Sequence, residues 1–102
     1  MLKVKKRNLS SLKRLILATS HYDLTRIPSI MAAKLVSMRF GIQLEIVDEN
    51  WLLERNLKPY LPSFMLELLD NRILVLRVGG LLNYFELSQR IIEEIQRLNL
   101  SS

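Results

Sequence analysis

The chain contains a single histidine, His21, and no cysteine, which limits the catalytic chemistry that its sequence can support. A catalytic dyad, a triad or a histidine metal site would have to be built around that one imidazole, and thiolate chemistry is excluded. His21 lies in residues 20–23, directly after a predicted strand, where α/β folds place functional loops. The spacing supplies neither a nucleophile nor a second metal ligand. We therefore expect an ordinary loop histidine, no catalytic residues, no metal site and no cofactor.

A phosphate-binding turn is the second chemistry that the sequence suggests. Gly79 and Gly80 follow a predicted strand and precede a predicted helix, with Arg77 nearby, and backbone amides at such a turn can hold a phosphate. The chain has no Gly-x-Gly-x-x-Gly and no Gly-Lys-Ser/Thr motif, however. A nucleotide- or phosphate-metabolite-binding domain or enzyme subunit, with its site at residues 20–23, Arg77, Gly79 and Gly80, is thus the alternative function, and a non-enzymatic one is favoured.

The basic residues concentrate at one end of the chain. The net charge is +5 over 102 residues, and no acidic residue precedes Asp23. Six of the fifteen lysines and arginines lie in residues 1–14, namely Lys3, Lys5, Lys6, Arg7, Lys13 and Arg14. We predict a basic N-terminal arm over residues 1–13 and a single domain over 14–102. Such an arm makes salt-dependent contacts with nucleic acid or another acidic surface, but without interleaved aromatic residues it lacks a base-stacking platform.

Hydrophobic periodicity predicts alternating strands and helices. The expected elements are a strand over 14–20, a helix over 28–40, a strand over 43–48, a short helix after Asp48, a helix over 63–69, a strand over 72–78 and a helix over 84–98. A helix over 9–19 fits the first segment almost as well as the strand. Pro28 and Gly41 mark the ends of the second element, and Asn83 with Glu86 forms a capping box for the last. This order predicts an α/β fold with a small, three-stranded, mostly parallel sheet flanked by helices.

The predicted helix over 28–40 is apolar on most of its sides. Its clearly polar positions are Lys34, Ser37 and Arg39, so the helix is expected to be covered by its own domain or by a partner. We predict that it binds a protein partner or a second copy of the chain. The expected contact residues are Met31, Leu35, Met38 and, from the loop over 58–63, Tyr60.

One stretch, RLILATSHYDLTRIPSIMAAKLVSMRFGIQLEIVDENWLLE, resembles the second half of a BRCT domain. In that family a strand leads through an Arg-x-Pro turn, here Arg26 and Pro28, to a helix. A second strand then ends in a signature that Ile46, Val47, Trp51 and Leu52 would supply. The resemblance covers residues 14–55 and implies a non-catalytic module that binds partner proteins, often phosphorylated ones, in DNA repair or checkpoint complexes. The residues alone favour Trp51 as a core tryptophan on a short helix beside a strand.

The composition also constrains the compartment. No apolar run approaches the roughly 18 to 20 residues that span a bilayer, so no membrane span is predicted. The absence of cysteine suits a reducing compartment, and we expect an intracellular protein, cytoplasmic or nuclear. The basic, serine-containing residues 1–22 leave a mitochondrial destination open. We predict a protein-interaction module that belongs to a nucleic-acid-associated complex.

Overall fold

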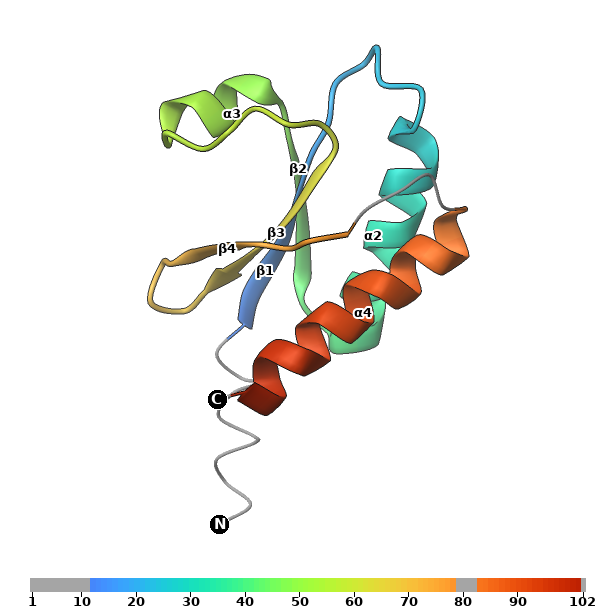
Figure 1. The fold of residues 1–102 in the computed structure, drawn as a ribbon, viewed down its shortest axis with the longest axis vertical. Helices are drawn as coiled ribbons and strands as arrows, with labels where there is room; N and C mark the ends of the chain where they lie inside the picture. Colours follow the sequence, from blue (N-terminus) through green and yellow to red (C-terminus); the bar gives the residue numbers. More distant parts are fainter. Residues whose placement is uncertain (1–11, 79–82, 102) are drawn as a thin grey trace.

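The computed structural model describes residues 12–78 and 83–101, which form alternating strands and helices around one sheet (Figure 1). The elements are β1 (Leu12–Ala18), α2 (Arg26–Phe40), β2 (Gln43–Val47), α3 (Glu49–Glu54), β3 (Ser63–Leu68), β4 (Ile73–Val75) and α4 (Tyr84–Ser101). The α/β class predicted from the sequence is therefore confirmed. The first segment is a strand and not the alternative helix, and α2 and α4 lie where helices were expected.

The sheet has four strands in the order β2-β1-β3-β4 and is mixed, which corrects the expected three-stranded, mostly parallel sheet. Within the described residues, β1 and β2 form the one parallel pair, with Leu15 opposite Leu44. Strand β3 runs antiparallel to β1, with Leu15 opposite Leu66, and β4 runs antiparallel to β3. In the described residues α2 therefore connects the parallel strands β1 and β2, the segment with α3 crosses β1 to connect β2 with β3, and β3 and β4 form a hairpin.

The segment over 63–69, predicted to be a helix, is strand β3. Its methionine, leucines and glutamate are good helix formers, but pairing on both sides decides the outcome. In the strand, Phe64 and Leu66 face one core cluster and Met65 faces the other, so alternation buries all three. A short turn then connects β3 to β4 as a hairpin, and in this turn Asn71 has a φ of 72°. Asparagine tolerates this left-handed conformation, so it can occupy the turn. A glycine at this position would have indicated a hairpin turn more clearly from the sequence.

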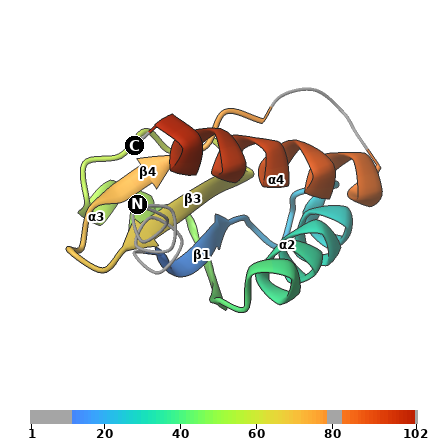
Figure 2. The same cartoon turned by 90° about the horizontal axis from the view of Figure 1, so that it is seen from below.

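The two faces of the sheet are covered unequally. Helices α2 and α4 pack together on one face, over a core that includes Leu15, Leu17 and Phe64 (Figures 1 and 2). The short helix α3 covers part of the other face, where Ile16 and Met65 pack with residues of α3. Successive residues of β1 thus enter different clusters, which explains why this strand is apolar at consecutive positions.

Candidate functional site

The outer face of α2 carries a row of exposed apolar side chains, which we call the α2 stripe: Ile27, Met31, Leu35 and Met38. Their exposed fractions are 70%, 40%, 38% and 77%. The intervals of three and four residues place all four on one side of the helix. The opposite side, with Ala32, Ala33 and Val36, is buried against the domain. The predicted contact residues of α2 are therefore exposed together, and Ile27, one turn before Met31, extends the row that sequence reasoning began at Met31.

Basic side chains border the α2 stripe. Helix α2 contains Arg26, Lys34 and Arg39 and no acidic residue. At about 3.6 residues per turn, Lys34 lies on one side of the stripe and Arg39 on the other, and both are exposed. The surface is therefore an apolar row with a cation along each border.

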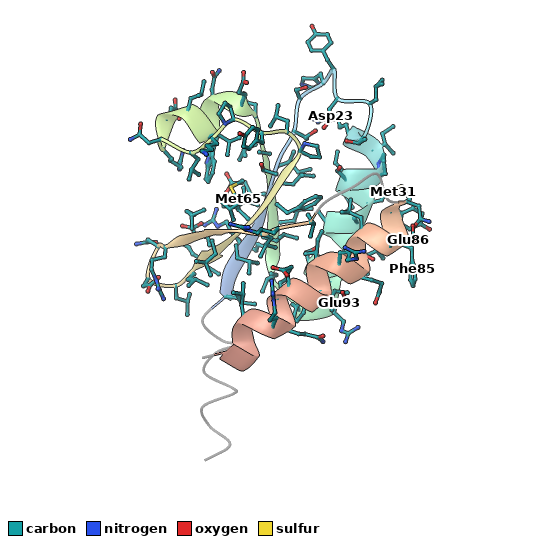
Figure 3. The ribbon with its side chains drawn as sticks, viewed as in Figure 1. Asp23, Met31, Met65, Phe85, Glu86 and Glu93 are labelled. Atoms are coloured by element: carbon teal, nitrogen blue, oxygen red, sulfur yellow. The ribbon has the colours of Figure 1, made fainter. Side chains whose placement is uncertain are left out.

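Helix α4 packs against α2, and its first turn also carries exposed apolar side chains. Figure 3 shows Phe85 and Glu86 of α4 on the same side of the molecule as Met31. Tyr84 and Phe85 are 42% and 60% exposed. These two aromatic residues were not predicted as contact residues, because the sequence does not reveal that α4 begins next to α2.

Asp23 fixes the loop that leads from β1 into α2 (Figure 3). The N–H and the hydroxyl of Thr25 donate to its Oδ1 at 2.8 and 2.7 Å, and the hydroxyl of Thr19 donates to Oδ2 at 3.1 Å. Partial burial would raise the pKa of the Asp23 carboxyl, but these hydrogen bonds and the positive charge of Arg26 outweigh burial and hold the pKa below its ordinary value. The carboxylate therefore ties the end of β1 to the start of the helix that carries the stripe.

A cavity of about 500 Å³ opens at the carboxyl ends of the parallel strands β1 and β2. His21 and Arg26 line it from one side, and Asp48 and Glu49 line it from the other. Its charges thus have both signs, and Asp48 is already engaged as the N-cap of α3, accepting from the N–H of Trp51 at 3.2 Å. Within residues 12–78 and 83–101, no group of three or more histidine, cysteine or acidic side chains is placed to hold a metal ion.

Arg77, the predicted phosphate ligand, lies elsewhere. It lines a separate groove of about 460 Å³ together with Lys58 and Tyr60, on the face of the sheet that bears α3. Tyr60 is 70% exposed, but it is on the opposite face of the sheet from the α2 stripe, so the structure does not bring it to the other three predicted contact residues. The predicted ligands Gly79 and Gly80 lie outside the described residues.

The basic residues predicted to contact nucleic acid divide into two groups. Lys3, Lys5, Lys6 and Arg7 lie outside the described residues. Lys13 and Arg14 belong to β1 and form ion pairs within the domain. Arg14 Nη1 lies 2.7 Å from Glu45 Oε1, Arg14 Nε lies 2.9 Å from Glu67 Oε1, and Lys13 Nζ lies 3.6 Å from Glu67 Oε2. Because Glu45 and Glu67 offset their charge, these two residues are poorly suited to bind phosphates.

Trp51 lies on the short helix α3 beside the sheet, as the residues alone predicted, but it is half-buried at the edge of a core cluster rather than within the core. It packs against the cluster of Ile16, Ala18, Leu52 and Met65, and the guanidinium carbon of Arg55 lies 3.9 Å from its ring centroid. This stacking is a cation–π contact at the surface.

No helix in the described part of the chain is both long enough and apolar enough to cross a bilayer. Comparison of the chain with family models, curated proteins and solved structures gave no match. The geometry of the side chains described above is therefore the basis for inferring what the chain does.

Proposed function

We propose that this chain is a non-enzymatic interaction module whose α2 stripe binds an amphipathic helix of another protein. The observation that carries the proposal is the continuous row of Ile27, Met31, Leu35 and Met38, exposed on a helix whose other side is buried. A surface helix ordinarily presents polar residues to water, and an exposed apolar row is typical of a surface that a partner covers. Amphipathic helices recognise such rows with apolar residues at intervals of three and four.

The positive charges beside the α2 stripe indicate which kind of helix it binds. Lys34 and Arg39 border the stripe, so the favoured ligand carries glutamate or aspartate residues along the borders of its own apolar face. A second copy of the chain fits less well. In a two-fold interface each α2 would meet the same patch of its neighbour, which would bring the cations of the two copies together. We therefore assign the stripe to an acidic, amphipathic helix of a different protein.

The basic residues 3–7 and the BRCT resemblance extend the proposal to the setting in which the module acts. An arm with four closely spaced cations attracts polyanions through salt-dependent contacts that carry no sequence preference. The resemblance implies a partner-binding module in DNA repair or checkpoint complexes. Together they support a protein-interaction module that assembles near nucleic acid, with the arm as an accessory contact and the α2 stripe as the specific one.

The proposal is tested with a labelled helical peptide that has leucines on one face and glutamates along its borders. We expect saturable binding by fluorescence anisotropy, and at least about tenfold weaker binding to the Leu35→Glu variant, because a buried charge opposes docking. Leu53→Glu is the matched control, since Leu53 of α3 is also half-exposed, at 51%, but far from the stripe. The same peptide with lysine in place of glutamate should bind at least about tenfold more weakly.

Two results would count against this assignment. Equal loss of binding in the Leu35→Glu and Leu53→Glu variants would show that the peptide does not use the stripe. Sedimentation of the chain alone would reveal a dimer if the stripe binds a second copy, and disruption of that dimer by Leu35→Glu would replace the proposed partner with the chain itself.

A second candidate function is phosphate-metabolite binding at the carboxyl ends of β1 and β2. The observation that favours it is the cavity of about 500 Å³ with Arg26 at its wall, at the edge where α/β sheets commonly bind ligands. Thermal unfolding with ATP and with inorganic phosphate is the test. A ligand at a hundred times its dissociation constant stabilises the folded state by about 2.7 kcal/mol, and Arg26→Ala should abolish that gain. An unchanged melting temperature with both ligands would remove this candidate.

A further inference from the structure

The outer edge of β4 offers unpaired backbone groups. Strand β4 ends the sheet, and within the described residues it pairs with β3 alone. The N–H of Leu76 donates to the carbonyl of Phe64 at 2.9 Å, and the N–H of Leu68 donates to the carbonyl of Arg72 at 2.9 Å. Backbone groups alternate in an antiparallel ladder, so residues 72, 74 and 76 face β3. Ile73 and Val75 therefore direct their N–H and C=O groups away from the sheet.

A groove lies next to this edge, on the face that bears α3. Its volume is about 460 Å³, and its floor includes the buried side chains of Leu52 and Met65. Figure 3 shows Met65 between α3 and the sheet. Val75, which is 56% exposed, adds an apolar wall from β4 itself. The groove thus combines an apolar floor with an adjacent strand edge.

The rim of the groove is basic. Lys58 and Arg77 are the charged residues that line it, both are exposed, and neither forms an ion pair with a described residue. The loop that carries Lys58 is held in place, because the hydroxyl of Ser63 donates to the carbonyl of Tyr60 at 2.5 Å and the N–H of Tyr60 donates to the carbonyl of Lys58 at 2.9 Å. The rim is therefore a formed surface with uncompensated positive charge.

We propose that an extended, acidic segment of a partner protein adds to the sheet at β4 and fills this groove. Its backbone would pair with the outward-facing groups of Ile73 and Val75, as in other cases of strand addition. Side chains two residues apart lie on the same face of a strand, as Val75 and Arg77 do. The matching ligand therefore has an apolar residue and an acidic residue separated by one position, the first over Val75 and the second at Arg77.

The charges of the rim exclude two other occupants. Residues 1–11 of the chain itself carry only basic charges, so they would place like charges together at Lys58 and Arg77. A second copy joined through its own β4 would bring two basic rims into contact. The groove beside β4 is thus distinct from the α2 stripe and lies on the other face of the sheet. It binds an extended ligand, whereas the stripe binds a helix.

The test uses a labelled peptide in which valine and glutamate occupy alternate positions, with threonine between them, and a counterpart with lysine in place of glutamate. We expect the acidic peptide to bind at least about tenfold more tightly than the lysine peptide, and the Arg77→Glu variant to reverse that preference. Arg90→Glu is the matched control, because it makes the same charge change at an exposed arginine of α4, on the opposite face of the sheet, and Arg90 forms no ion pair with a described residue. Its preference for the acidic peptide should remain.

Amide hydrogen exchange tests whether the peptide forms hydrogen bonds with the backbone of β4. Bound peptide should slow exchange of the amides of Ile73 and Val75 and leave those of the α2 stripe unchanged. Unslowed exchange at both amides, or equal affinity for the two peptides, would overturn the proposal. Displacement of the peptide by inorganic phosphate or ATP would assign Arg77 to a phosphate ligand and would overturn it too.

Discussion

At the scale of single residues, two buried serines differ in whether their hydroxyl is satisfied. Ser29 of α2 and Ser88 of α4 are each 1% exposed. The hydroxyl of Ser88 donates to the carbonyl of Phe85 at 2.7 Å, whereas that of Ser29 has no hydrogen-bond partner among the described residues. A buried hydroxyl without a hydrogen-bond partner loses its contacts with water and gains nothing in return, which destabilises the folded state. Serine also forms helices less readily than alanine.

We therefore predict that Ser29→Ala raises the free energy of unfolding by about 1 kcal/mol. Ser88→Ala is the control at equal burial, and because it removes a satisfied hydrogen bond it should leave stability unchanged or lower it. Urea denaturation of the two variants and the wild-type chain measures both effects. A Ser29→Ala variant less stable than the wild type would show that its hydroxyl has a partner in solution.

Asp23 gives a prediction on pH dependence. Its pKa in the folded chain is lower than in the unfolded chain, where it is about 3.9, so its stabilising effect is complete above that value and is lost as the pH falls through the folded pKa. Asp23→Ala should lower the free energy of unfolding by about 1 kcal/mol at neutral pH, a modest figure for a partly solvated carboxylate. The wild type and the variant should converge in acid. A difference that stays constant down to low pH would contradict this.

At the scale of elements, the end of α2 depends on the backbone conformation of Gly41. This residue has a φ of 64°, and its N–H donates to the carbonyl of Ser37 as the helix ends. A Cβ atom added at Gly41 would meet no atom within 4 Å, so a substitution there introduces no clash. Any loss of stability must then come from the left-handed backbone conformation, which residues other than glycine and asparagine rarely adopt.

Gly41→Ala should accordingly lower the free energy of unfolding by about 1 kcal/mol, and Gly41→Asn should lower it by less, because asparagine tolerates the left-handed region. Thermal or urea unfolding of both variants distinguishes the two. Equal stability of the alanine variant and the wild type would mean that α2 can end in another conformation. The binding surface should be affected as well, since Met38 lies in the last turn of α2.

At the scale of the whole molecule, positive charge is concentrated in the first fourteen residues, which hold six of the fifteen lysines and arginines. Lys13 and Arg14 are engaged by Glu45 and Glu67. Deletion of residues 1–8 removes Lys3, Lys5, Lys6 and Arg7 and should strongly weaken binding to a labelled single-stranded DNA at low salt. If all four contact phosphates, the slope of log affinity against log salt should fall in magnitude by roughly three. Affinity that survives the deletion would place the nucleic-acid contact on the domain.

Much of this molecule is determined by local sequence. The apolar run that becomes β1, the Pro28 and Gly41 signals that bound α2, and the Asn83 cap before α4 specify their elements through backbone and capping chemistry that acts over a few residues. Asn83 Oδ1 accepts from the N–H of Glu86 at 2.8 Å, as the capping pattern predicts. The exposure of Met31, Leu35 and Met38 also agrees with the composition of α2, which is apolar on more sides than the domain can cover.

Tertiary structure alone decided the rest. The segment that becomes β3 is a strand because β1 and β4 lie on either side of it, and no local pattern in 63–68 reveals those partners. That pairing also makes the sheet mixed, leaves β4 as its edge, and places Lys58, Tyr60 and Arg77 around one groove. Residues far apart in the sequence meet only when strands pair and helices pack. The elements and three residues of the α2 stripe could therefore largely be predicted from the chain, whereas the pairing of β3 and the groove beside β4 could not.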